Sequence, residues 1–196
     1  MQRKWLVGGV VGALALVAVL ALVIGGVVGR SIVPAPAEPS RPATERFADT
    51  LTDVAISYPA TWVRRIPRDQ GVRILASSPD ASAGVSVSVR PSGLEEPVTA
   101  RLLPVVRPLT DDLLKTDTRI NAIGTPTAVT IGGLPGWRYT YTYRMQDKTE
   151  GAHIHYYLFK DARLVQIVLQ AVPKEKLDEL QPTFDQIADT FEGSRR

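Results

Sequence analysis

Three runs of alternating apolar and polar residues follow one another in the last third of the chain. They cover residues 137–145, 152–160 and 164–172, and only a few residues separate them. Alternation with a period of two is typical of β-strands with one buried face, and short gaps join antiparallel neighbours. The pattern therefore predicts an antiparallel meander, which contains both histidines and most of the tyrosines of the chain.

The phase of these runs predicts which side chains are buried. If Met145 lies opposite Ala152 and Phe159 opposite Leu164, one face of the meander is continuously apolar. That face would hold Tyr139, Tyr141, Tyr143, Ile154, Tyr156, Leu158, Val165, Ile167 and Leu169. The opposite face would hold Arg138, Thr140, Thr142, Arg144, His153, His155, Tyr157, Gln166 and Gln170. We expect the first face to be core, and we predict a contact surface on the second, formed by Arg138, Arg144, His153, His155 and Tyr157.

Shorter alternating runs predict strands at 53–58, 62–66, 72–77, 84–90 and 127–131. Two segments have helical spacing instead. In the first, the apolar residues are Leu102, Val105, Val106, Leu109, Leu113 and Leu114, and two prolines restrict the best helix to about 109–115. The second starts at Pro173, is divided by Pro182 and has the stripe Leu177, Leu180, Phe184, Ile187, Ala188 and Phe191. The predicted fold class is α+β, a mainly antiparallel sheet with helices packed on it.

The N-terminal part has a different composition. Residues 5–29 contain no charged side chain, and about 20 apolar residues suffice for a helix to cross a membrane. We therefore predict a transmembrane helix at 5–29 after a cytoplasmic tail, residues 1–4. A cleaved signal peptide is the alternative, because Ala35-Pro36-Ala37 resembles a cleavage site. Glycines four residues apart in this segment would also allow a homodimer through the span.

Basic residues favour one orientation of that span. Arg3 and Lys4 precede it and Arg30 follows it, which places the N-terminus in the cytoplasm and the rest outside. Residues 30–45 are rich in proline and predict a semi-rigid linker. Residues 46–192 would form the domain and 193–196 a basic tail. The expected location is the cell membrane, with a single span and an extracytoplasmic domain.

Composition argues against several functions. Basic and acidic residues are nearly balanced within 46–192, so the domain lacks the positive surface that nucleic acid requires. The chain has no cysteine. His153 and His155 are spaced to chelate zinc or copper from one strand face, but a site needs a third ligand, and a polar sheet face is the simpler interpretation. No Gly-x-Ser-x-Gly motif or phosphate-binding loop is present. We expect no enzyme activity and no cofactor.

Several short motifs occur in the order found in one known superfamily. They are Ile56-Ser57-Tyr58-Pro59-Ala60-Thr61-Trp62, the Gly132–Gly136 turn before an aromatic strand, the strand-turn-strand from Tyr156 to Leu169, and Ile187-Ala188-Asp189-Thr190-Phe191. In this order the chain resembles the PsbP-like α/β/α sandwich domains. That superfamily includes the extrinsic photosystem II subunit and many exported bacterial proteins of unknown role. The resemblance implies the sandwich fold and an accessory or binding role without catalysis.

Arg64, Arg65, Arg68 and Arg73 form the only basic cluster of the predicted domain. Such a cluster can contact anionic lipid or an acidic partner, although a solvated edge is the more ordinary interpretation. Together these features predict a membrane-anchored extracytoplasmic protein that binds a protein, lipid or envelope component. A histidine-centred metalloprotein or enzyme, and a purely structural spacer, are the alternatives.

Overall fold

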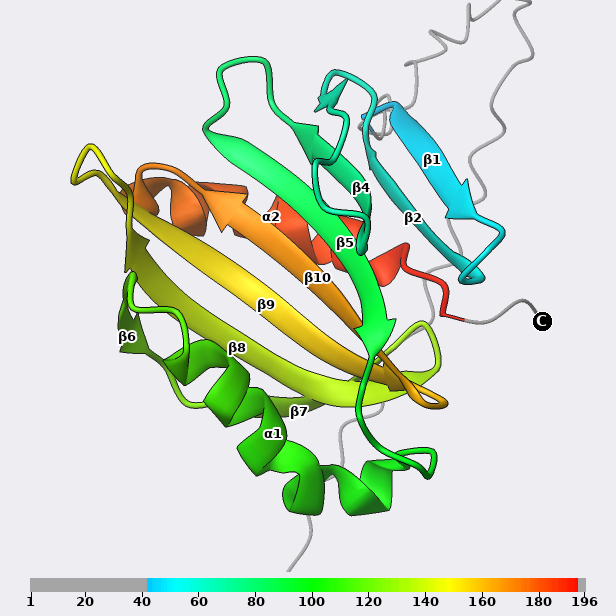
Figure 1. Cartoon of the computed structure of the whole chain (residues 1–196). Coiled ribbons are helices and arrows are strands. Elements are labelled where there is room, and N and C mark those ends of the chain that lie inside the picture. The colour runs from blue at the N-terminus through cyan, green and yellow to red at the C-terminus, as the bar shows by residue number, and fades with distance from the viewer. Residues whose placement is uncertain (1–41, 194–196) are drawn as a thin grey trace, which may run out of the picture. The chain divides into compact units, whose positions relative to one another are not determined.

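The computed structural model describes residues 42–193 (Figure 1). The predicted transmembrane helix, its orientation, its possible dimer and nearly all of the linker lie outside the described residues. Within 42–193, every helix is too short or too polar to cross a membrane. Residues 41–196 form a compact unit of their own, and both hydrophobic clusters of the described residues lie within it. This segment can therefore be studied as an isolated domain.

One antiparallel sheet organises the domain. Its strand order is β3-β4-β5-β10-β9-β8-β6, and β7 also pairs with β8. The strands are β3 (Val63–Arg64), β4 (Val72–Ser77), β5 (Ala83–Pro91), β6 (Ile120–Ile123), β7 (Thr127–Ile131), β8 (Leu134–Arg144), β9 (Glu150–Lys160) and β10 (Arg163–Ala171). The predicted meander is thus β8-β9-β10. The short run at 62–66 gives only the two residues of β3.

The two helices cover opposite faces of this sheet (Figure 1). Helix α2 (Leu177–Asp189) packs Phe184 and Ile187 onto the face that includes Ile154 and Leu169. Helix α1 (Leu103–Lys115) packs Leu103 and Leu114 onto Trp137, Tyr139 and Tyr157. Each sheet face therefore has its own hydrophobic cluster. The predicted α+β class, a mainly antiparallel sheet with helices packed on it, is confirmed.

One hairpin register was predicted correctly and the other was not. Phe159 pairs with Leu164, as expected. Tyr143, however, pairs with Gly151 and Tyr141 with His153, an odd-numbered shift from the expected register. Because side chains alternate between faces, an odd shift moves every β8 side chain to the other face. Tyr139, Tyr141 and Tyr143 therefore share a face with the histidines, not with Ile154 and Leu158.

Helix α1 begins earlier than predicted. Pro104 lies in its first turn, where the missing N–H has no intrahelical role, and Pro108 is accommodated inside the helix. The buried side chains are Leu103, Thr110 and Leu114. Helix α2 likewise continues through Pro182, after a 3₁₀ turn at Lys174–Lys176, and its predicted apolar stripe faces the core.

The buried face of α1 differs from the predicted stripe, because Leu102, Val105 and Leu113 of that stripe are exposed, and this difference gives a matched test. Leu114 is 2% exposed and its neighbour Leu113 is 38% exposed. We expect Leu114→Ala to lower the free energy of unfolding by about 2 to 3 kcal/mol, because it opens a cavity between the C-terminal end of α1 and the sheet. Leu113→Ala should cost less than about 1 kcal/mol. Urea unfolding of residues 41–196 measures both, and equal losses would contradict the observed helix face.

A two-stranded ribbon lies beside the main sheet. Strand β1 (Thr44–Asp49) pairs with β2 (Val54–Pro59) along their whole length. Strand β1 begins inside the segment predicted as linker, so the prediction of a linker as far as residue 45 is wrong at its C-terminal end. Arg64 stacks on the Phe47 ring, with its guanidinium carbon 4.7 Å from the ring centre. At the C-terminus, Gly193 donates to the carbonyl of Gly132 and so belongs to the fold.

Candidate functional site

The predicted contact residues do not share one surface. Arg138 and Arg144 pair with Tyr156 and Glu150 on β9, so they lie on the face opposite to His153, His155 and Tyr157. His155 is only 5% exposed and Tyr157 is buried against α1. The polar face that the expected register created is therefore not present. Arg144 is exposed and lies 3.5 Å from a carboxylate oxygen of Glu150.

The histidines instead form a hydrogen-bonded chain with a tyrosine. The Tyr141 hydroxyl lies 3.0 Å from Nδ1 of His153 and 3.1 Å from Nδ1 of His155. The other nitrogen of His153, Nε2, lies 3.1 Å from Oε1 of Gln170. Neighbouring tyrosine rings pack on both imidazoles, with Tyr157 stacked 4.0 Å from His155. We call Gln170, His153, Tyr141 and His155 the His–Tyr chain.

The acceptor at one end sets the proton positions along the His–Tyr chain. Since Gln170 Oε1 can only accept, neutral His153 carries its proton on Nε2 and leaves Nδ1 bare. Tyr141 then donates to His153 and accepts from the Nδ1–H of His155. This leaves His155 Nε2 without a proton, and no described residue meets it with hydrogen-bond geometry, although the Gln166 side chain lies near enough to raise the pKa of His155. In all three hydrogen bonds the donor lies on the His155 side and the acceptor on the Gln170 side.

Burial keeps both histidines neutral. Desolvation lowers the pKa of His153 to about 4, an effect that the bond to Gln170 partly offsets. Desolvation also lowers the pKa of His155 to about 3, and the neighbouring His153 adds to this. Burial raises the pKa of Tyr141, so its hydroxyl stays protonated. The chain thus consists of neutral groups at physiological pH, which is the behaviour of a structural core network.

The His–Tyr chain approaches the surface at a shallow hollow. Gln170 lines this hollow of about 510 Å³ together with Arg119, Arg144, Met145 and Asp147. Arg119 is held by Asp117, at 2.6 Å between Nη2 and Oδ2. Arg144 is the only predicted contact residue that lines this hollow.

A second cavity has a more distinctive lining. It measures about 280 Å³ and lies between the β2–β3 turn, the β4–β5 turn and helix α2. Its lining residues, none of them charged, are Pro42, Thr44, Ser57, Tyr58, Pro59, Thr61, Trp62, Ser78, Ser82, Ala83, Leu180, Thr183, Gln186, Ile187 and Thr190. We call it the Trp62 pocket.

Local hydrogen bonds show which polar groups of the Trp62 pocket are already used. Thr190 Oγ1 accepts from the backbone N–H of Ser57 at 2.8 Å and fixes β2 to the end of α2. The hydroxyls of Ser78 and Ser82 bond to Asp80. The polar side chains of Thr61, Thr183 and Gln186, in contrast, make no hydrogen bond to any described residue, and they remain available to a ligand.

The sequence analysis did not predict the Trp62 pocket, although it singled out the motif that forms one of its walls. The motif from Ile56 to Trp62 supplies Ser57, Tyr58, Pro59, Thr61 and Trp62, but it was interpreted only as a mark of the fold. The other walls come from residues 78–83 and 180–190. The second of these segments lies more than a hundred residues after the Ile56–Trp62 motif. The tight turn, in which Trp62 N–H donates to the carbonyl of Pro59 at 2.9 Å, directs this motif onto α2.

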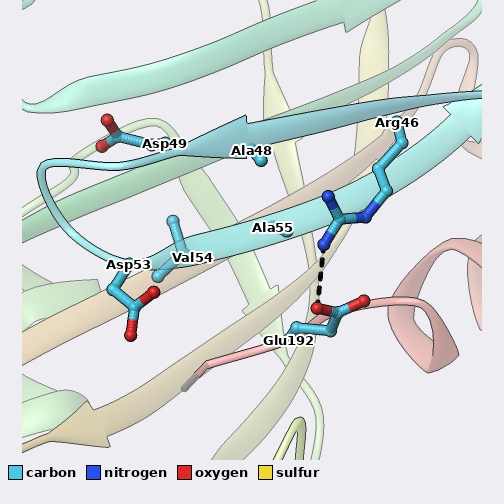
Figure 2. Close-up of a pocket in the computed structure, with 7 residues that line it drawn as sticks. All are labelled: Arg46, Ala48, Asp49, Asp53, Val54, Ala55 and Glu192. Carbon is cyan, nitrogen blue, oxygen red and sulfur yellow. Dashed lines mark hydrogen bonds and ion pairs between the residues drawn. The ribbon is translucent and has the colours of Figure 1, made fainter. Parts of the chain in front are cut away.

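The acidic hollow in Figure 2 is a weaker candidate. Its lining includes Arg46, Asp49, Asp53 and Glu192, and the dashed line marks the Arg46–Glu192 ion pair of 2.9 Å. The two aspartates lie at the β1–β2 turn, away from Glu192 (Figure 2). Asp49 accepts from Thr52 and the backbone of Leu51, so it stabilises the turn. These carboxylates do not converge on one point.

Within residues 42–193 there is no group of three or more His, Cys, Asp or Glu side chains placed to hold a metal ion. Both nitrogens of His153 already have partners, and the free nitrogen of His155 is buried. His153 and His155 therefore act on each other through Tyr141 and do not open together onto a common site.

Comparisons of sequence and of structure give different results. No protein-family model matches the chain, and no curated protein sequence matches it. Solved structures do. The chain is similar to cyanobacterial PsbP (CyanoP) from Synechocystis sp. PCC 6803, at 16% identity and a TM-score of 0.54, over 82% of this chain and 98% of that one.

Two further structures share this architecture. LpqN of Mycobacterium tuberculosis, described as involved in cell envelope biogenesis, is 12% identical with a TM-score of 0.54, over 80% of this chain and 86% of LpqN. A Bacteroides thetaiotaomicron protein is 13% identical with a TM-score of 0.51, over 78% of this chain, which spans only 48% of that protein. Such low identities establish the fold and nothing finer. The domain of residues 42–193 has the PsbP-like fold.

Proposed function

We propose that this chain is a non-enzymatic binding or accessory protein, anchored to the cell membrane by residues 5–29, with an extracytoplasmic domain. Its ligand site is the Trp62 pocket. One observation carries this assignment: a pocket of about 280 Å³ with an uncharged lining, two aromatic rings and unused hydroxyl and amide groups. Pockets of mostly apolar lining with a few placed polar groups are typical of small-molecule sites.

The lining also favours binding over catalysis. A serine or threonine nucleophile needs an adjacent base such as His, Asp, Glu or Lys, and no residue of these types lines the pocket. Its one titratable side chain, Tyr58, has its pKa raised by burial and stays protonated. The expected ligand is an uncharged molecule, or an uncharged part of one, with an apolar body and hydroxyl groups. The envelope role described for LpqN supports an envelope component as its source.

Filling the pocket tests this proposal. Thr183 lies on α2, lines the pocket and is partly exposed, so Thr183→Phe places a ring in the cavity without disturbing the core. We expect native mass spectrometry of the chain purified from its own membranes to show a bound small molecule. Its occupancy should fall roughly ten-fold in Thr183→Phe, a loss of about 1.4 kcal/mol.

Thr130→Phe is the matched control, because it makes the same change at an exposed position of β7, outside the pocket. It should retain the bound molecule. If the wild-type chain carries no molecule, or if Thr183→Phe retains it fully, the Trp62 pocket is not a ligand site.

A further inference from the structure

One end of the domain is basic and carries exposed apolar side chains. The loop between β3 and β4 contains Arg65, Ile66 and Arg68, and the Ile66 side chain is 94% exposed. Both arginines are exposed, and neither side chain has an ion-pair or hydrogen-bond partner among residues 42–193. Arginines flanking an isoleucine in solvent combine charge with a side chain that can enter the headgroup region of a bilayer.

This loop is continuous with a hollow that is also basic. The hollow, of about 380 Å³, is lined by Leu51, Arg73, Arg90 and Arg163, among others. Leu51 is 78% exposed. The loop touches the hollow directly, because Gly71 lies against the guanidinium of Arg90. We call the β3–β4 loop, residues 65–71, and this hollow together the basic end.

The acidic residues nearby do not cancel its charge. Those in the same segments are Asp49, Asp53, Asp69 and Asp161. The first three are paired with Arg73, Lys160 and Arg90, respectively. Arg65, Arg68 and Arg163 remain without an ion pair to any described residue. The Nε of Arg73 is buried and lies 3.5 Å from Oδ2 of Asp49, so this arginine is already engaged by that carboxylate.

The loop is held in a defined shape and does not depend on a partner for it. The backbone N–H of Arg65 donates to the carbonyl of Leu75 at 2.7 Å. At the other side, Gly71 N–H donates to Oδ1 of Asp69, also at 2.7 Å, and Val72 N–H donates to its carbonyl. Ile66 is therefore presented to solvent between two fixed points. A preformed surface of this kind loses little conformational freedom on binding.

From these observations we infer that the basic end is a docking surface for the anionic headgroups of a bilayer, with Ile66 and Leu51 entering the interface. The inference rests on the proposed function, in which residues 5–29 anchor the chain and so keep the domain near a membrane. Strand β1 is six residues long, so its far end, next to Leu51, lies about 20 Å from the point where the linker enters the domain. The twelve residues 30–41 can extend to about 40 Å, which lets this end reach the same membrane.

Vesicle binding by the domain of residues 41–196 tests the inference. The probes are phosphatidylcholine vesicles with and without one quarter phosphatidylglycerol. We expect sedimentation with the anionic vesicles only, and its weakening by salt. Arg65→Ser/Arg68→Ser should weaken binding roughly twenty-five-fold, at about five-fold for each arginine. Ile66→Ser should weaken it several-fold without changing its salt dependence.

The control variant is Arg101→Ser/Lys148→Ser, which removes the same charge from two exposed positions away from the basic end. It should bind within about two-fold of the wild type, because binding depends on the arginines of the basic end and not on the net charge of the domain. Binding to neutral vesicles alone, no binding to either vesicle, or equal losses in the two double variants would each overturn the inference. None of these outcomes bears on the Trp62 pocket, which contains none of the altered residues.

Discussion

Lowering the pH from 7 to 5 should lower the free energy of unfolding of the domain by about 4 kcal/mol. The cause is the burial of His153 and His155, whose pKa values in the fold are about 4 and about 3. In the unfolded chain each titrates near pH 6.5. Between those values the unfolded state binds more protons than the folded state, so stability rises with pH.

The sign and the window follow directly. The stabilisation is fully present above about pH 6.5 and is lost as the pH falls toward the folded pKa values. At pH 5 each histidine contributes a loss of about 2 kcal/mol. Carboxylates whose pKa is lowered in the fold, among them Asp69 and Asp117, lose their contribution at lower pH. The interval from pH 7 to 5 therefore isolates the histidines.

Two variants identify the groups responsible. His155→Phe should halve the difference in unfolding free energy between pH 7 and pH 5, whatever it does to stability at pH 7. Tyr141→Phe removes the bridging hydroxyl but leaves both imidazoles buried, so the full difference should remain. Urea unfolding followed by tryptophan fluorescence at the two pH values provides the comparison. A full pH difference in His155→Phe would show that other groups titrate.

The two hairpins of the meander show why register was only half predictable. Strands β9 and β10 are joined by Asp161 and Ala162 alone, and such a short turn allows few pairings. Strands β8 and β9 are joined by residues 145–149, where Met145 N–H donates to the carbonyl of Thr149. A loop of this length permits several registers, and β8 alternates tyrosine with threonine and arginine. The simplest pattern, apolar with apolar, was therefore the wrong one.

That error explains the predicted contact surface. Tyrosines and histidines can share a buried face when their polar atoms bond to one another, as in the His–Tyr chain. Binary patterning assigns such residues to opposite faces, because it counts histidine as polar. The Trp62 pocket was hidden for another reason. Its walls combine hydroxyl, aromatic and aliphatic residues from distant segments, and only the fold brings them together.

Three features of the domain are therefore separable. The Trp62 pocket uses β2, the β4–β5 turn and α2. The basic end uses the β3–β4 loop, the β1–β2 turn and the β9–β10 turn. The His–Tyr chain lies on β8, β9 and β10, on the sheet face that α1 covers. There its neutral, mutually hydrogen-bonded groups stabilise the fold. Ligand binding, membrane contact and acid sensitivity should accordingly respond to different substitutions.

Gly136→Ala should be the most damaging small substitution in the sheet. Gly136 pairs with Val129 on one side of β8 and with Leu158 on the other. A methyl group built there would lie only 2.1 Å from the carbonyl oxygen of Tyr157 and 2.9 Å from the Cα of Leu158. Both are backbone atoms of the central strand β9, so the clash can be relieved only by moving strands apart. We expect a loss of about 3 kcal/mol or more.

Gly84→Ala is the matched control, since Gly84 also lies in a strand with partners on both sides. There the nearest backbone atom to the added methyl, the carbonyl oxygen of Ala76, is 3.3 Å away, a contact that a small shift relieves. Its cost should stay within about 1 kcal/mol. Urea unfolding of residues 41–196 compares the two variants, and soluble yield with circular dichroism serves if Gly136→Ala does not fold. Similar stabilities would mean that β8 and β9 are not as closely apposed at Gly136 as the register requires.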